Sequence, residues 1–254
     1  MIRLPIRYLA LVALPVCALL AVACSGSNPQ LSHVFKAPPW TGPETYTYTL
    51  VDQGNNQTGT CVLNTKPGLP PGETTLEYLC NDPKGDRDDR TVVANSQTLV
   101  PLSSSRTIFN KSANTRTVVA TEYSGTKVLL KFDDNGTVHT VSRDLPKPTN
   151  ESPDPGYYSD EAIFWVVRGI PLQKGYQGAY VDVNASASGG QTFTASIKVE
   201  AAEQVKVPAG TFQAWRVRLE TDSITQYFWV NEAAPHQVIQ AQIEATKFQL
   251  ASLN

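Results

Sequence analysis

Short runs rich in Thr, Val, Ile and aromatic residues recur along most of this 254-residue chain, with Gly, Pro, Asn and Asp between them. Thr alone occurs 25 times. β-branched and aromatic side chains suit the pleated, half-buried surface of a strand. Many short strands with regular turn signals are typical of a sandwich or barrel. We expect strands at residues 44–51, 58–64, 74–80, 91–100, 106–111, 115–123, 127–133, 137–142, 191–200, 203–207, 211–220, 224–231 and 237–250.

Two of the turns between these runs have a sequence with a defined mechanism. Asp133-Asp134-Asn135-Gly136 is a strong hairpin signal, because Asn-Gly accepts the positive φ angles of a type I′ turn. In Val207-Pro208-Ala209-Gly210, the proline fixes φ at the second position and the glycine takes the left-handed conformation. Both sequences predict a sharp reversal between antiparallel strands.

One segment, residues 160–168, has the pattern of a helix. Ser159 can cap its start, the acidic pair that follows suits the positive end of the helix dipole, and Gly169 can end it. Residues 162–167 are apolar on every side, so a helix here must be buried. Because the run is short, a buried strand is the competing interpretation. The patterns together predict a mainly β fold: a curved antiparallel sheet or open β-barrel-like single domain with one short buried helix.

The N-terminus has the features of an export signal. Arg3 and Arg7 precede an apolar run over residues 8–23 that is shorter than the roughly 20 residues of a membrane span. The run ends in Ala21-Val22-Ala23-Cys24, which resembles the lipobox of bacterial lipoproteins. In such proteins the cysteine is acylated and the peptide is cut before it. We expect Cys24 to be lipidated, and plain secretion with an unmodified Cys24 is the alternative.

These signals divide the chain into three parts. Residues 1–23 would be a lipoprotein signal peptide, residues 24–43 a flexible tether with four prolines, and residues 44–254 one β-rich domain. Residues 144–157 form a Pro-rich connector inside the domain, either a domain boundary or a long loop. The expected location is the bacterial cell envelope, outside the cytoplasm and lipid-anchored. Ser25 after the cysteine fits delivery to the outer membrane in a diderm bacterium.

Cysteine usage predicts one disulfide. Cys17 would leave with the signal and Cys24 would carry the lipid, so Cys61 and Cys80 remain as a pair. In an exported chain an even pair indicates a disulfide, although two buried thiols are the alternative. A 20-residue loop closed in this way stabilises a fold by about 3 kcal/mol in the chain-entropy model.

Charge and motifs exclude several functions. A net charge of −2 and a pI of about 5.9 argue against nucleic-acid binding. No nucleophile-elbow, zinc-protease, phosphate-loop or dinucleotide motif is present. The three histidines, His33, His139 and His236, are expected at the surface or in packing. The acidic run at 81–90 is expected to be a solvated loop, with a weak calcium site as the alternative. We therefore expect no catalytic residues, no cofactor and no metal.

The chain resembles a family of bacterial exported proteins known as domain of unknown function 3108. The most specific match is Val207-Pro208-Ala209-Gly210-Thr211-Phe212, followed by Tyr227-Phe228-Trp229-Val230. Looser matches are Gly42-Pro43-Glu44-Thr45-Tyr46 and the step from Asp160 through Arg168 to Leu172-Gln173-Lys174-Gly175. The resemblance spans residues 42–250 and implies one continuous β-rich domain. It implies no catalytic residues, because the family has none assigned.

Binding is a more plausible function than catalysis. The chain is also similar to envelope lipid carriers, in which a curved sheet or open barrel wraps a helix around an apolar cavity. That similarity implies a lining made by Phe164, Trp165, Trp215, Tyr227 and Trp229, and an ordinary packed core is the alternative. The favoured hypothesis is a lipid-anchored, non-enzymatic protein that binds or carries an apolar or amphipathic envelope molecule. A structural or assembly lipoprotein with a protein-binding face is the second hypothesis, and an enzyme is the third.

Overall fold

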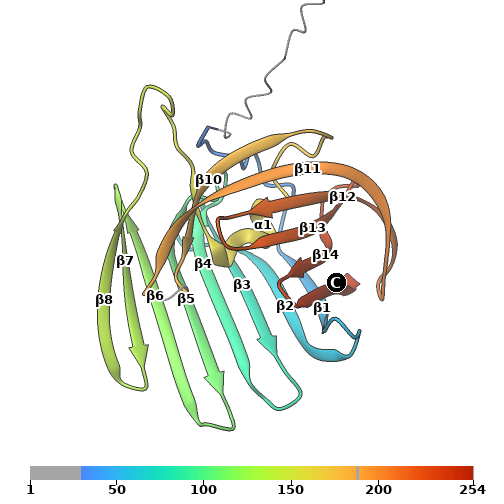
Figure 1. The fold of residues 1–254 in the computed structure, drawn as a ribbon, viewed down its shortest axis with the longest axis horizontal. Helices are drawn as coiled ribbons and strands as arrows, with labels where there is room; N and C mark the ends of the chain where they lie inside the picture. The colour runs from blue at the N-terminus through green and yellow to red at the C-terminus, as the bar shows by residue number, and fades with distance from the viewer. Residues whose placement is uncertain (1–29, 187–188, 254) are drawn as a thin grey trace, which may run out of the picture.

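The computed structural model describes residues 30–186 and 189–253, and they form one sheet around a short helix, antiparallel except for the parallel pair β9–β10 (Figure 1). The expected signal peptide at 1–23 and the lipid site Cys24 lie outside the described residues. Before the helix come β1 Glu44–Val51, β2 Gln57–Pro67, β3 Glu73–Asn81, β4 Arg87–Asn95, β5 Pro101–Asn110, β6 Thr115–Ser124, β7 Lys127–Asp134, β8 Thr137–Asp144 and β9 Tyr157–Ser159. A 3₁₀ turn at Asp160–Ala162 leads into α1 at Ile163–Val166. After it come β10 Gln177–Asn184, β11 Gln191–Val207, β12 Gly210–Glu220, β13 Thr225–Asn231, β14 Val238–Ile243 and β15 Thr246–Leu253.

The sheet consists of two halves, β1–β8 and β9–β15, that are joined by pairing between β1 and β15. Its order runs β8 to β1 and then β15 back to β9, so the first strand pairs with the last. The residues of the Pro-rich connector lie between β8 and β9, the two edge strands of this sheet. The expected fold class, a mainly β open barrel with one short helix, is confirmed.

The two ends of the sheet overlap instead of closing into a cylinder. Val183 and Ala185, at the end of β10, pack with Val119 of β6 and Val128 and Leu130 of β7 in a second apolar cluster. Tyr123 of β6 also stacks on Tyr157 of β9, with ring centroids 6.2 Å apart. β10 therefore lies between the barrel interior and the inner face of β6 and β7.

The main core surrounds α1. The ring of Phe164 contacts four other aromatic rings with centroids 5.3–5.8 Å away, those of Tyr48, Tyr78, Phe228 and Phe248. These rings come from β1, β3, β13 and β15, so the helix fills the barrel as its all-apolar sequence predicts. The helix is shorter than expected, since residues 160–162 form the 3₁₀ turn and α1 ends at Val166.

Of the expected tether at 24–43 the structure describes residues 30–43, and part of that stretch packs against the barrel. Val34 and Phe35 are buried in the main core. The backbone N–H of Ser32 donates to the carbonyl oxygen of Ala179 at 2.8 Å. The backbone N–H of Lys36 donates to the carbonyl oxygen of Gly169, also at 2.8 Å. This segment packs against the barrel because it brings two large apolar side chains, which the four prolines around them obscured.

Both sequence-defined turns are present, and some strand boundaries differ. Asn135 and Gly136 have φ angles of 50° and 91°, and Gly210 has 139°. The expected strand at 237–250 is wrong: it is two strands, because the chain reverses at Glu244, whose φ is 51°. The expected strands 191–200 and 203–207 are one strand, β11, with an irregularity in between. β9 and β10 were not expected.

Cys61 and Cys80 form the expected disulfide. They lie directly opposite each other on β2 and β3, with Cα atoms 4.1 Å apart. Both point into the barrel, in line with the buried positions on either side of them.

Among the described residues, no helix is both long and apolar enough to cross a membrane.

Candidate functional site

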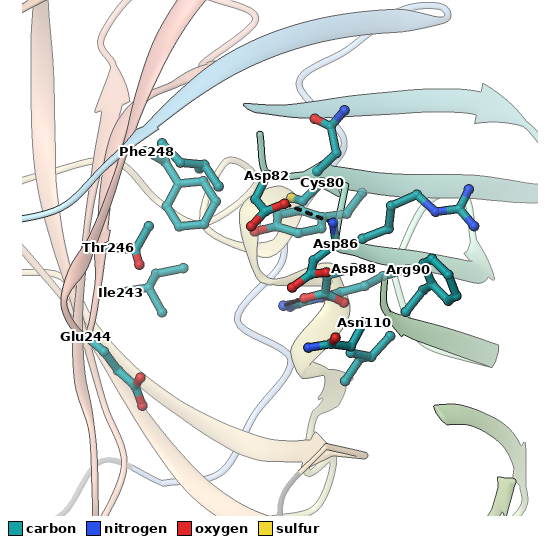
Figure 2. Close-up of a pocket in the computed structure, with 16 residues that line it drawn as sticks. Cys80, Asp82, Asp86, Asp88, Arg90, Asn110, Ile243, Glu244, Thr246 and Phe248 are labelled. Carbon is teal, nitrogen blue, oxygen red and sulfur yellow. Dashed lines mark hydrogen bonds and ion pairs between the residues drawn. The ribbon is translucent and has the colours of Figure 1, made fainter. Parts of the chain in front are cut away.

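One hollow of the barrel, which we call the mouth cavity, has a volume of about 410 Å³. It lies where the ends of β3, β4 and β5 face the turn between β14 and β15 (Figure 2). Figure 2 shows one wall formed by Ile243, Glu244, Thr246 and Phe248, and the facing wall by Cys80, Asp82, Asp86, Asp88, Arg90 and Asn110.

Much of the mouth cavity is apolar. Leu50, Ile243 and Phe248 line it from β1, β14 and β15, and Ile108 and Phe109 line it from β5. Ile108 is 39 % exposed although it faces this hollow. A large apolar side chain left exposed inside a concave surface is a common feature of ligand sites.

A partly buried ion cluster lies at the inner side of the mouth cavity. Asp88 accepts hydrogen bonds from Arg90 Nη2 (2.7 Å) and from Arg106 Nε (2.7 Å) and Nη2 (2.8 Å). Arg90 also lies over the ring of Tyr78, 4.5 Å from its centroid. Burial acts to raise the pKa of Asp88, but the hydrogen bonds and charges of the two arginines outweigh it and hold the pKa below its ordinary value.

This cluster corrects the expectation of a solvated loop at 81–90. Only the turn before β4 is a loop, and Asp82 there accepts the backbone N–H groups of Lys84 and Asp86, each at 2.9 Å. From Arg87 the chain is a strand, and its alternation turns Asp88 and Arg90 inward. The described part of the chain contains no group of three or more His, Cys, Asp or Glu that could hold a metal ion.

Two further hollows of the barrel adjoin the mouth cavity in turn. The first inner cavity, of about 200 Å³, shares Tyr78, Arg90 and Phe248 with the mouth cavity. The second inner cavity, of about 250 Å³, shares Asp160 and Gln226 with the first. The mouth cavity thus adjoins the first inner cavity, and the first adjoins the second, which reaches β10.

The inner cavities contain buried carboxyl groups. Asp160 lines both of them, Glu161 lines the first, and Asp182 of β10 lines the second. Burial raises the pKa of all three. The negative charge of Asp160 further raises the pKa of Glu161 and of Asp182. Carboxyls with a raised pKa occur both in acid–base catalysts and in structural clusters, so they do not by themselves indicate catalysis.

Several buried polar atoms around these carboxyls have no hydrogen-bond partner among the described residues. They share a position on the inner surface of the barrel or beside the 3₁₀ turn: Ser104 Oγ, Thr121 Oγ1, Tyr123 OH, Glu161 Oε1 and Gln226 Oε1. Buried polar groups in folded proteins nearly always have a partner, so such a concentration requires an explanation.

The five aromatic residues expected to line a cavity do not form one set. Phe164 lines the first inner cavity. Trp165 is packed in the core, where its Nε1 donates to Thr65 Oγ1 at 2.8 Å. Trp215 pairs with Val230 on the inner face but is only half-buried.

Tyr227 and Trp229 contradict the expected lining. Their neighbours Gln226, Phe228 and Val230 are the buried residues of β13, so alternation places Tyr227 and Trp229 on the outer face. Trp229 Nε1 donates to Glu203 Oε1 there. The sequence places Trp215 on the inner face of its strand. Which residues of β13 share that face depends on the register between β12 and β13, which the sequence does not give.

The three histidines take packing roles. His139 stacks on Phe132, with centroids 4.7 Å apart. His236 Nδ1 lies 2.9 Å from the carbonyl oxygen of Asn231. His33 lies edge-on to Tyr158, and its Nε2 is 3.3 Å from Asp154 Oδ1.

A second buried ion pair closes the other end of the barrel. Arg168 follows α1 and donates to Glu44 Oε2 at 2.9 Å. It also donates to the carbonyl oxygens of Pro235 (2.9 Å) and His236 (3.1 Å). Its guanidinium lies 4.9 Å from the ring centroid of Trp40.

Solved structures show what this fold is similar to. The chain resembles a β-barrel-like protein of the domain of unknown function DUF1849 from Brucella abortus, with a TM-score of 0.56 and 12 % identity over 84 % of this chain and 97 % of that one. At this identity the likeness concerns the fold alone.

Two further structures are more distant. One is a "putative lipoprotein" from Parabacteroides distasonis, with a TM-score of 0.36 and 12 % identity over 87 % of this chain and 99 % of that one. The other is a "putative exported protein" from Bacteroides fragilis, with a TM-score of 0.36 and 11 % identity over 87 % and 99 %. These scores are too low to support an argument about this chain.

No curated protein matches this chain. The family model described as "Protein of unknown function (DUF3108)" matches residues 84–246, which run from the turn before β4 to the first residue of β15. That match includes α1, the lining of the second inner cavity, part of the lining of the other two hollows, and the turn at 207–210. The chain belongs to the DUF3108 family.

Proposed function

We propose that this protein is a bacterial envelope lipoprotein that binds a small apolar or amphipathic molecule in the mouth of its barrel and does not transform it. The mouth cavity is the observation that carries the proposal. Its volume of about 410 Å³ lies within the usual range for ligand sites, roughly 300–1,000 Å³. Aliphatic and aromatic side chains form its walls, and a few charged groups lie at its inner side.

The charged groups favour an amphipathic ligand. Asp88, Arg90 and Arg106 hold one another in fixed positions, so polar atoms of a ligand would meet preorganised partners. Leu50, Ile108 and the other apolar residues of the wall would contact the rest of the molecule. Few, fixed polar groups in an apolar hollow provide orientation as well as affinity.

The arrangement of β1 keeps the mouth away from the N-terminal segment. Glu44, at the start of β1, pairs with Arg168 beside Trp40, whereas Leu50 near its end lines the mouth cavity. Six residues of strand separate the two sites, about 20 Å. A lipid at Cys24 would therefore anchor the chain from the segment packed at the closed end and leave the mouth free.

Native mass spectrometry of the full mature protein, extracted from membranes in mild detergent, tests the binding. We expect a co-purifying small molecule, and we expect Ile108→Glu to remove it by placing a charge in the mouth cavity. Leu129→Glu is the matched control, because Leu129 is 46 % exposed but lies on the outer face of β7. If neither the wild type nor the control carries a small molecule, the proposal fails.

The anchor is tested separately. Cys24→Ala should release the protein from the membrane fraction, because acyl chains on the cysteine provide the attachment. Retention of this variant in membranes would contradict lipid anchoring at Cys24.

The second candidate function is an assembly lipoprotein with a protein-binding face. Leu79, Leu129 and Val138 are exposed on the outer face of the sheet, which is the observation in its favour. A partner protein that co-purifies with the wild type and is lost from Leu129→Glu, with no small molecule present, would select this function.

A further inference from the structure

The second inner cavity is built differently from the mouth. Carboxyl groups of Asp160 and Asp182 face its volume of about 250 Å³, together with the amide of Gln226. Phe193, Leu219 and Ile224 form apolar parts of its lining. The cavity therefore combines a concentrated set of acceptors with a hydrophobic wall.

The carboxyl groups around this cavity have no direct ion-pair partner among the described residues. Asp88 pairs with both Arg90 and Arg106, and the charges of these two arginines also act to lower the pKa of Asp160. Within residues 30–186 and 189–253, neither Asp160, Glu161 nor Asp182 forms an ion pair, and only Glu161 accepts a hydrogen bond, from Ser159. The interior thus has four carboxyls and two guanidinium groups within it.

Two buried side chains of this cavity, and Glu161 of the neighbouring first inner cavity, have an oxygen without a hydrogen-bond donor among the described residues. Asp182 is only 5 % exposed, and the described residues provide no hydrogen-bond or ion-pair partner for it. Gln226 is 8 % exposed and Glu161 3 %, and each has an unpartnered side-chain oxygen. The unpartnered atoms are oxygens that accept hydrogen bonds. Burying such an oxygen without a donor costs folding free energy.

We infer that the second inner cavity binds the cationic amine group of a small organic ligand, with Asp160 and Asp182 as its counter-ions. An ammonium group carries three N–H donors and a positive charge, which Asp160 and Asp182 lack as direct partners among the described residues. Phe193, Leu219 and Ile224 would contact a short apolar body. This inference rests on the proposed function, since it names the class of molecule that the barrel binds.

The electrostatics agree with this assignment. Burial raises the pKa of Asp160 and of Asp182; the negative charge of Asp160 raises that of Asp182 further, whereas Arg90 and Arg106 act to lower that of Asp160. A cation between them would supply the opposite charge that stabilises their ionised forms.

The test uses three probes of equal length: hexylamine, hexanol and hexanoate. Binding to the full mature protein in detergent is measured by titration calorimetry at pH 7, where hexylamine is a cation. We expect hexylamine to bind at least tenfold more tightly than hexanol and hexanoate to bind least. Asp182→Asn should lower the affinity for hexylamine at least tenfold and change the affinity for hexanol less than threefold.

Asp154→Asn is the control, because this carboxyl is exposed and lies outside the cavity. It should bind hexylamine like the wild type. If Asp182→Asn does not fold, Asp160→Asn replaces it with the same expectation. Equal binding of hexylamine and hexanol, or unchanged hexylamine binding in the aspartate variant, overturns the amine assignment while leaving the proposed function intact. Failure of all three probes, together with no co-purified molecule, overturns both.

A fourth probe distinguishes two sources of the amine. Putrescine has two ammonium groups and no apolar end, whereas hexylamine has one of each. Tighter binding of hexylamine supports an amphipathic amine such as a lipid headgroup with part of its chain. Tighter binding of putrescine, lost in Asp182→Asn, supports a free polyamine in the same site.

Discussion

Replacing Arg168 by Met tests how much the closed end of the barrel contributes to stability. The side chain of Arg168 is 3 % exposed and that of Glu44 is 12 % exposed, so the change leaves a buried carboxylate without its cation. It also removes the donors to two backbone carbonyls and the contacts with the rings of Trp40 and Tyr46. The methionine retains most of the apolar volume, which isolates the polar loss.

The magnitude follows from the burial of the pair. Removing one partner of a buried ion pair costs about 3–5 kcal/mol. In a domain of this size, each kcal/mol lowers Tm by roughly 2–4 °C, so we expect a fall of roughly 6–20 °C. Urea unfolding followed by tryptophan fluorescence gives the free energy, and calorimetry gives Tm.

A matched control separates burial from charge pairing. Arg216 donates to Glu200 at 2.6 Å, but its side chain is 40 % exposed. Arg216→Met should cost less than about 1 kcal/mol, as exposed pairs do. If Arg168→Met also costs less than 1 kcal/mol, the reasoning from the buried pair is refuted. Glu44→Gln should recover part of the loss when it is combined with Arg168→Met.

Three further changes have defined outcomes. Replacing both Cys61 and Cys80 by Ala should lower the free energy of unfolding by about 3 kcal/mol, as measured in urea, and a reducing agent should then have no further effect. Trp165→Phe should cost about 1–3 kcal/mol, because it leaves Thr65 without its indole donor and a gap in the core. Since burial raises the pKa of Asp182, the folded state retains a proton that the unfolded chain releases above about pH 4, and stability falls as the pH rises through the folded-state pKa. Asp182→Asn should therefore gain stability relative to the wild type between pH 4 and 8 in urea titrations, and a difference independent of pH would contradict this.

Local sequence determined the elements whose cause lies within a few residues. The Asn135-Gly136 turn depends on positive φ angles that these two residues accept, and the turn at 207–210 depends on Pro208 and Gly210. In most strands of this sheet one face is buried and the other is exposed. Apolar and polar residues therefore alternate along the chain, and this alternation predicted the strands from the sequence. The pairing of Cys61 with Cys80 followed because only two cysteines remained.

The tertiary structure alone decided where the sheet overlaps itself. β10 was not expected because it is buried on both faces, between the main core and β6–β7, so the usual alternation is missing from its sequence. The docking of Val34 and Phe35 depends on a surface formed by residues more than a hundred positions away. Neither contact has a signal within its own segment.

The candidate site was also beyond local sequence. Asp88 and Arg90 have the composition of a solvated loop, and only the strand register and the approach of Arg106 make them an interior ion cluster. Asp160 and Asp182 come together because β10 returns beside the 3₁₀ turn. Charge burial depends on distances between segments that are far apart in the chain, whereas strand propensity depends on neighbours, which is why the sequence determined the β fold and the tertiary structure decided the cavity.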